Sequence, residues 1–398
     1  MNVTTGAVPF AYSVRKARST YGMRRLSTDF VSSVMRACRA GMRSVIGAPR
    51  ADCNVDARGA GSYCAVVSPL RLGIVGVGRH GSRYARHAAR DVEGIDLVVV
   101  CRRDGAAGRE IAAQCACEYT ADAVGLCTRA DIDAVVLVTV PSLLEDLVSA
   151  AAGSGKRLLV EKPVAPDAAT GGRIRDTLDA ASAYCLAGHT LRFNTVVNRI
   201  RDQLPLLGRI DSIVMSQRFP PQPQIEWIDD PERSGGGSIL HTGVHCFDLI
   251  RYITGLEPAT VACRTAAVYT ARTEDNFASL MTFENSDALA MITCARSSRA
   301  RNGLIEISGE NGQLIGDHVH NTLVHITPEG REEIALPPPA HTVQVALEAF
   351  VDDARTGAAP RASYRDGLAA VAVADACSHA AHSGRQEPVV LPPETAVV

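Results

Sequence analysis

Residues 71–81, RLGIVGVGRHG, constrain the fold of this 398-residue chain more than any other stretch. The apolar run 72–75 predicts a short buried strand, and three glycines follow it at G-x-G-x-x-G spacing before a helical stretch that ends near Arg90. The first glycine permits a tight turn, the second lets backbone approach a pyrophosphate, and the third lets helix and strand pack closely. The helix N-terminus offers N–H groups to the phosphates. We therefore predict a dinucleotide-binding loop made of Gly76, Val77, Gly78, Arg79, His80 and Gly81.

The next predicted strand favours one form of the dinucleotide. It covers residues 95–101, IDLVVVC, and ends where the fingerprint expects the residue that contacts the ribose. An acid there would bind the 2′-hydroxyl of NAD, but this chain has Arg102 and Arg103. Two guanidinium groups suit a 2′-phosphate, so the sequence favours NADP(H). NAD(H) stays open as the alternative, with Asp104 reaching the ribose.

Strands and helices continue to alternate after this unit. Residues 133–140 and 157–160 predict buried strands, and residues 142–152 predict a helix between them. This order implies a doubly wound parallel sheet, a Rossmann fold, over residues 70–190. The loops after two of these strands should face the cofactor, through Thr139, Val140, Pro141, Glu161 and Lys162.

The pattern changes in residues 191–398, which we predict to be a substrate-binding and oligomerisation domain of the α+β class. Apolar and polar positions alternate in seven stretches, which predicts a large, mostly antiparallel open sheet. The expected strands are 209–218, 260–270, 278–283, 289–294, 303–308, 313–316 and 323–326. Helices are expected at 343–354 and 366–381. The outer face of this sheet is the predicted interface of a homodimer or homotetramer.

The overall composition and charge exclude several classes of protein. The net charge is −2, which argues against nucleic-acid or membrane-surface binding, and no apolar run is long enough to cross a bilayer. Twelve cysteines without a C-x-x-C pair indicate reduced thiols in a cytoplasmic protein. Residues 1–69 are basic and poor in acids; they predict a disordered or non-native extension, interpreted as a transit peptide, a tail or an upstream start.

Lysine occurs only three times, against 38 arginines, which draws attention to Lys162. It follows a predicted buried strand and precedes Pro163, so its ammonium should point into the crevice at the carboxyl edge of the sheet. The alternative is an ordinary solvated pair of Glu161 and Lys162 at a strand end.

The stretch GGGSILHTGVHCFDL, residues 235–249, leads into a helix expected from about residue 239 to Gly255. His241 and His245 are four residues apart and share a face, and Asp248 is placed to contact His245. A histidine that titrates near neutral pH can exchange a proton with a carbinol oxygen. Two alternatives stay open: a zinc pair, as in a hydrolase or lyase, and satisfied core histidines.

Together these motifs resemble the Gfo/Idh/MocA oxidoreductases. The resemblance rests on G-x-G-x-x-G, on Glu-Lys-Pro at 161–163, on GHTLRF at 188–193 and on GGG-x-x-x-x-x-G-x-H-x-x-D at 235–248. It covers the chain from about residue 70 onward. It implies a Rossmann domain, a C-terminal α/β domain with an open sheet, frequent oligomers, and NAD(P)-linked chemistry on sugars, cyclitols and related compounds.

The resemblance also assigns roles. The family's catalytic lysine falls on Lys162 and its catalytic histidine on His245, whereas His241 stands where the family often has an aspartate. Leu144 stands where many members have His or Asn. No catalytic metal is expected, because the lysine and histidine can together supply charge stabilisation and proton transfer. Further candidates for substrate contact are His189, Arg192, Trp227 and Asp248.

The sequence thus predicts an NAD(P)-dependent dehydrogenase or reductase. It would transfer a hydride between nicotinamide and a carbinol or carbonyl carbon of a sugar, inositol or related polyol. His245 would exchange the hydroxyl proton, Lys162 would stabilise the alkoxide, and His241 would lie beside them. The alternative is a non-catalytic dinucleotide-binding sensor of the same fold, which would need neither Lys162 nor His245.

Overall fold

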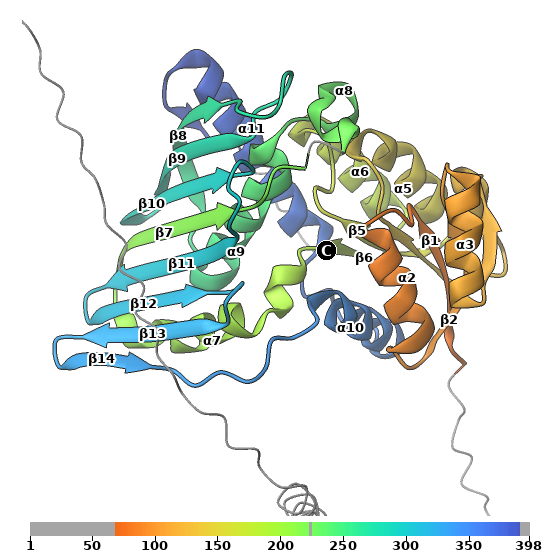
Figure 1. The fold of residues 1–398 in the computed structure, drawn as a ribbon, viewed down its shortest axis with the longest axis horizontal. Helices are drawn as coiled ribbons and strands as arrows, with labels where there is room; N and C mark the ends of the chain where they lie inside the picture. The colour runs from red at the N-terminus through yellow and green to blue at the C-terminus, as the bar shows by residue number, and fades with distance from the viewer. Residues whose placement is uncertain (1–67, 223–224, 391–398) are drawn as a thin grey trace, which may run out of the picture. The chain divides into compact units, whose positions relative to one another are not determined.

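The computed structural model describes residues 68–222 and 225–390 (Figure 1). The expectation for the N-terminal extension concerns residues 1–69, of which 1–67 lie outside this range. Two sheets dominate, one of six strands and one of nine, which confirms the predicted fold class. In Figure 1 the six-stranded sheet lies at the right and the nine-stranded sheet at the left.

The six-stranded sheet is entirely parallel and has the order β3-β2-β1-β4-β5-β6. Its central strands are buried apolar runs, as expected when helices cover both faces. The strands are β1 (Leu70–Val75), β2 (Ile95–Cys101), β3 (Glu118–Thr120), β4 (Ala134–Leu137), β5 (Arg157–Glu161) and β6 (Cys185–Gly188). The helices are α2 (Gly81–Arg90), α3 (Gly105–Cys115), α4 (Ala123–Thr128), α5 (Leu144–Gly153) and α6 (Ala168–Ala180).

The strand order reverses between β1 and β4, and ligands of such sheets bind outside the carboxyl ends at that point. The strand predicted at 133–140 is shorter than expected. It ends at Leu137, and a 3₁₀ turn begins at Pro141, which has no N–H for a strand ladder. Residues 138–140 therefore form a loop at the carboxyl end of β4.

The nine-stranded sheet has the order β14-β13-β12-β11-β7-β10-β9-β8-β15. Only β7 and β10 pair in parallel; the other neighbours are antiparallel. The strands are β7 (Ile210–Arg218), β8 (Pro258–Ala266), β9 (Asn276–Phe283), β10 (Ser286–Ala295), β11 (Asn302–Gly309), β12 (Gly312–Asp317), β13 (Thr322–Thr327), β14 (Gly330–Glu333) and β15 (Glu387–Pro388). All seven predicted strands are present, and β14 and β15 were not predicted.

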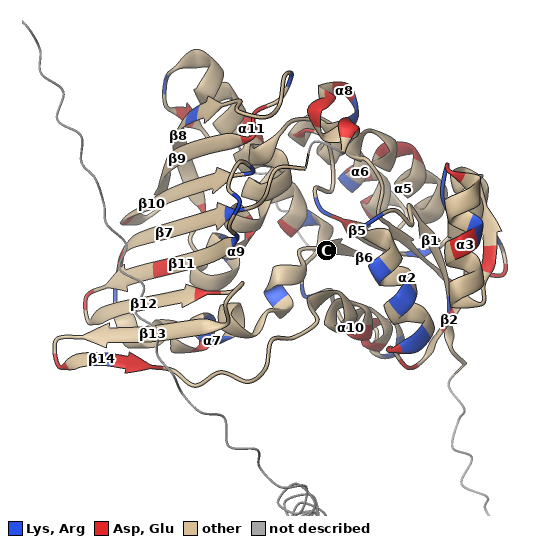
Figure 2. Cartoon of the chain, in the orientation of Figure 1, with Lys and Arg blue, Asp and Glu red and all other residues tan. Residues whose placement is uncertain are grey.

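The two faces of this sheet differ, because side chains alternate along each strand. Phe277 and Met281 are buried on one face, which α7 (Thr195–Gln203), α9 (Val244–Thr254) and α11 (Tyr364–Ser383) cover. Leu280 and Met291 stand opposite each other in the register of β9 and β10, and both are exposed. Figure 2 shows these two strands almost without charged residues.

The C-terminal helices connect the two sheets. Helix α10 (Thr342–Thr356) packs against α2, and α11 packs against α6, α9 and β8. A reciprocal pair of bonds between Ser363 and Asp366 caps the start of α11. Among the described helices, none has the length and apolar content to span a membrane.

Candidate active site

The glycine-rich loop has the space that a dinucleotide needs. A Cβ on Gly76, whose φ is +94°, would lie 2.0 Å from the Val138 carbonyl oxygen, and one on Gly81 would lie 2.2 Å from the Gly76 oxygen. A Cβ on Gly78 would meet no atom within 4 Å. The first and third glycines are thus required by packing, whereas the second faces open space. Because α2 begins at Gly81 without an acid in its first turn, the loop fits a pyrophosphate.

Arg102 lies against this loop. Its guanidinium donates a hydrogen bond to the Val77 carbonyl at 3.2 Å, while the Arg103 side chain is exposed. Asp104 caps α3, accepting the Ala107 N–H at 3.2 Å. The Asp104 carboxylate, which would have to bind the ribose of NAD, therefore already has a hydrogen-bond partner in α3.

Glu161 ends β5 and is buried beneath the loop. Its carboxylate accepts the Tyr84 hydroxyl at 2.6 Å and the Lys162 main-chain N–H at 3.0 Å, and it lies 2.9 Å from the His80 ring. Burial opposes ionisation, but the His80 and Lys162 charges and the bond from Tyr84 hold the pKa of Glu161 at about 2. Because the Glu161 carboxylate contacts all three groups, it holds His80, Tyr84 and the Lys162 backbone in position.

Lys162 follows Glu161 at the carboxyl edge of the sheet. Its ammonium donates to the main-chain carbonyl of His241 at 3.2 Å, and burial lowers its pKa. Val138, at the start of the loop after β4, packs on Gly76, so Thr139, Val140 and Pro141 follow at the carboxyl edge of the sheet. The loops predicted to face the cofactor therefore lie along one edge with Lys162.

His241 lies in a single π-helical turn, Ile239–Gly243, that precedes α9. Its Nε2 donates to the Ser234 carbonyl at 3.0 Å, and its ring meets the edge of the Trp227 ring at a centroid distance of 5.3 Å. Burial, with the charges of Lys162 and Arg296, lowers the pKa of His241 to about 3. The ring is therefore neutral at pH 7.

His245 begins the regular part of the helix. Its ring stands edge-on to that of His189 at 6.3 Å, and its Nδ1 is buried without a hydrogen-bond partner in the described residues. Burial and the Lys162 charge lower its pKa well below the usual value. The expected contact between Asp248 and His245 is wrong, because Asp248 binds Arg192 instead.

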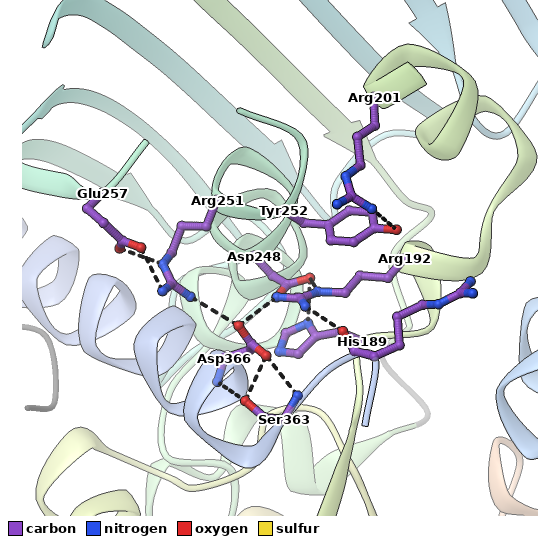
Figure 3. Close-up of polar contacts among 10 residues, drawn as sticks. His189, Arg192, Arg201, Asp248, Arg251, Tyr252, Glu257, Ser363 and Asp366 are labelled. Atoms are coloured by element: carbon purple, nitrogen blue, oxygen red, sulfur yellow. Dashed lines mark hydrogen bonds and ion pairs between the residues drawn. The ribbon is translucent and has the colours of Figure 1, made fainter. Parts of the chain in front are cut away.

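The buried polar network in Figure 3 explains that difference. Arg192 donates to both oxygens of Asp248 at 2.7–3.1 Å, to the Arg361 carbonyl at 2.8 Å, and pairs with Asp366 at 3.1 Å. His189 Nδ1 lies 3.6 Å from Asp248. Arg192 and Asp248, two of the candidates for substrate contact, thus bind one another. Their ion pair attaches α9 to the turn after β6.

Sequence analysis missed Arg296, which follows β10 and has no motif around it. Burial lowers its pKa, and its charge acts on Lys162 and His241. Only the strand register, in which its N–H binds the Asp275 carbonyl at 2.8 Å, brings it to this site. Among the described residues, no three His, Cys, Asp or Glu side chains are grouped as metal ligands, so the zinc-pair alternative lacks a third ligand there.

Comparison with known families identifies both parts of the chain. The model of the oxidoreductase family with an NAD-binding Rossmann fold, GFO_IDH_MocA, matches residues 70–189. The model of the GFO/IDH/MocA C-terminal domain matches residues 205–315.

Similar proteins are named dehydrogenases. Inositol 2-dehydrogenase of Rhizobium meliloti (strain 1021) is 27% identical over 338 residues, covering 80% of this chain and 98% of that protein. D-apiose dehydrogenase of Paraburkholderia graminis is 23% identical over 331 residues, covering 76% of this chain and 86% of that protein.

Solved structures share the fold. Levoglucosan dehydrogenase in complex with NADH and levoglucosan superposes with a TM-score of 0.75 at 18% identity, covering 82% of this chain and 100% of the other. An oxidoreductase domain protein from Kribbella flavida gives 0.74 at 24% identity, covering 81% and 100%.

Proposed function

The chain belongs to the Gfo/Idh/MocA family of oxidoreductases, and we propose that it is an NAD(P)-dependent dehydrogenase or reductase acting on a CH–OH group of a sugar, inositol or related polyol. The observation that carries the proposal is the 3.2 Å bond from the Lys162 ammonium to the His241 carbonyl. This bond connects Lys162, at the carboxyl edge of the six-stranded sheet, to the turn that precedes His245. Residues 70–190 would bind the dinucleotide, and residues 191–398 the polyol.

The side chains divide the chemistry between them. When bound, the nicotinamide would accept or supply the hydride. Lys162 would stabilise the negative charge that develops on the carbinol oxygen, since an ammonium in a partly desolvated site acts strongly. His245, which is neutral because its pKa is lowered, would accept the hydroxyl proton in the oxidative direction. His241 and Trp227 would form a wall of the pocket.

We also propose NADP(H) as the favoured dinucleotide. Arg102 lies on the glycine-rich loop, Arg103 is exposed beside it, and Asp104 is engaged by α3. Arg102→Asp should raise KM for NADP at least tenfold and shift the preference toward NAD, because the contact to the 2′-phosphate becomes a repulsion. An unchanged ratio of kcat/KM for the two dinucleotides would remove Arg102 from this role.

The direct test is nicotinamide absorbance change over a panel of sugars, inositols and their keto forms, with NADP and NAD run side by side. Turnover should be lost in Lys162→Ala and His245→Ala, while fluorescence titration still shows dinucleotide binding. His382→Ala, on the exposed last turn of α11, is the control and should keep wild-type turnover.

Two outcomes would contradict the proposal. Full activity in Lys162→Ala would remove the catalytic assignment. Tight dinucleotide binding without turnover of any panel member would favour the non-catalytic sensor.

For the assembled enzyme, we propose a homodimer or homotetramer formed through the outer face of the nine-stranded sheet. Leu280, Leu289 and Met291 are 44%, 45% and 54% exposed there, on neighbouring strands. Contiguous exposed apolar side chains are typical of an interface. Leu280→Glu combined with Met291→Lys should lower the mass measured by light scattering to that of a monomer. We further propose a cytoplasmic location, which the nine free cysteines in the described residues support.

A further inference from the structure

Arg296 lies at the border of a cavity of about 350 Å³. Ile228 and Asp229, from the same 3₁₀ turn as Trp227, form another wall, and Trp227 itself contacts His241. The cavity is therefore lined by the 3₁₀ turn whose Trp227 contacts His241.

Backbone contacts fix Arg296 at this place. Its N–H donates to the Asp275 carbonyl at 2.8 Å. The adjacent Glu274 carboxylate accepts the N–H groups of Gly237 at 3.2 Å and Ile239 at 2.8 Å. Asp275 thus binds the backbone of Arg296, and its neighbour Glu274 binds the backbone of the residues that lead into His241.

The Arg296 guanidinium feels the charges of Asp275 and Glu274, but neither carboxylate binds it directly in the described part of the chain. Within residues 68–222 and 225–390, Arg296 makes no side-chain hydrogen bond or ion pair, and its NH1 is buried and unpaired. Leaving a buried charged donor unsatisfied is costly, so the unpaired NH1 calls for a partner such as a bound anion or water. Lys162 feels the charge of the neighbouring Glu161 but has no carboxylate within ion-pair distance in the described residues, so neither cation forms an ion pair there.

Most of the acidic side chains around the cavity bind groups other than the Arg296 guanidinium. Asp229 accepts three main-chain N–H groups from residues 271–273, Asp275 accepts those of Val268 and Tyr269, and Asp230 pairs with Arg272. Glu274 is occupied as described above, and Glu226 is exposed. His241 is neutral at pH 7 and adds no carboxylate beside Lys162 and Arg296.

We propose that the substrate is an acidic polyol, a hexuronate or aldonate, whose carboxylate pairs with Arg296 while its carbinol group meets Lys162 and His245. This inference rests on the proposed function and specifies its substrate class. One free guanidinium suits one carboxylate, since its planar donors match the two oxygens. A phosphate dianion fits less well, because the second arginine of the cavity, Arg272, is already paired with Asp230.

The test compares acid and neutral partners of the same sugar. We would measure kcat/KM for D-glucuronate against D-glucose and for D-galacturonate against D-galactose, with D-glucose 6-phosphate as the phosphate arm. The wild-type enzyme should prefer the acids at least tenfold. Arg296→Gln should lower the acid-to-neutral ratio about tenfold or more, the effect of one buried charged hydrogen bond.

Two variants separate this role from a purely structural one. Arg272→Gln removes an exposed arginine from the same cavity and should leave the ratio unchanged. Arg296→Lys keeps the charge and should restore part of the acid preference even if the glutamine variant folds poorly.

The outcomes distinguish the inference from the proposed function. Three outcomes would overturn the inference but not the proposed function. The wild-type enzyme could turn over neutral sugars without preferring acids, or it could prefer the phosphate ester. Alternatively, Arg296→Gln could lower kcat/KM equally for the acid and the neutral sugar. Absence of turnover on every compound would overturn the proposed function. In that case calorimetry decides: Arg296-dependent binding of D-glucuronate supports the acid site, and its absence overturns it.

Discussion

The Lys162 ammonium lies 3.2 Å from the His241 carbonyl oxygen, which it binds across 79 positions of sequence. The lysine comes from the carboxyl edge of the parallel sheet, and the carbonyl comes from the π-helical turn before α9. In this turn the backbone departs from regular α-helix, as is frequent at functional sites. The contact therefore couples the position of the histidine-bearing helix to the edge at which the dinucleotide would bind.

Gly78 and Gly76 should respond differently to an added side chain. Gly78→Val should fold normally but lose dinucleotide affinity at least tenfold, because its side chain would enter the open space beside the loop. Gly76→Ala should instead destabilise the fold by about 2–4 kcal/mol, since φ is +94° and the Cβ meets Val138. Urea unfolding and fluorescence titration of NADP separate the effects. Normal affinity in Gly78→Val would place the pyrophosphate elsewhere.

Local pattern was enough to predict most of the fold. The strand at 95–101 was predicted with its observed bounds, because six of its seven residues, all but Asp96, are apolar. The extra strand β6, CLAG, was missed because four residues are too few to show a period that distinguishes a strand from a turn. β14, GREE, was missed because it is exposed on all sides.

Long-range contacts in the candidate site could not be predicted in the same way. The sequence spacing of His245 and Asp248 allowed a contact, but Arg192, 56 positions from Asp248, binds the carboxylate. Arg296 enters the site only through the strand register, which a single sequence does not specify.

The ion pair of Arg192 and Asp248 should matter greatly for stability. Asp248→Ala should lower the free energy of unfolding by about 3–5 kcal/mol, because it removes from the buried Arg192 guanidinium the carboxylate that accepts most of its hydrogen bonds. The double variant Arg192→Met with Asp248→Leu should lose less, since no buried charge is left. Urea unfolding measures both.

An exposed pair is the control for that experiment. Glu333→Ala removes the partner of Arg331, and both side chains are more than half exposed. Its effect should stay below about 1 kcal/mol. An equally small effect in Asp248→Ala would show that Arg192 does not need its carboxylate.

Stability should also fall in acid through His241. Its pKa is about 3 in the folded chain, against an ordinary value of 6.5, so the unfolded chain binds a proton that the folded chain does not. The free energy of unfolding should therefore decrease as the pH falls below 6.5. His241→Asn should make this dependence shallower by up to about 1.4 kcal/mol per pH unit between pH 6 and 4. His382→Asn is the exposed control, and an unchanged slope in His241→Asn would contradict the assignment.

His241→Asp should change the substrate preference. It places a carboxylate near Lys162 and Arg296, whose charges both act on position 241. A carboxylate there would pair with these cations and repel a substrate carboxylate, so the acid-to-neutral ratio of kcat/KM should fall about tenfold. The Lys162 pKa should rise at the same time, because an opposite charge favours the ammonium form, and the alkaline limb of the pH–rate profile should move to higher pH.

His241→Asn separates charge from shape in this experiment. Asparagine has nearly the same size as aspartate and likewise lacks the ring that contacts Trp227 and Ser234, but it carries no charge. If the proposed electrostatics hold, only the aspartate variant changes the ratio and the alkaline limb. Equal changes in both variants would mean that the ring of His241, rather than the absence of a carboxylate, determines which polyol enters the site.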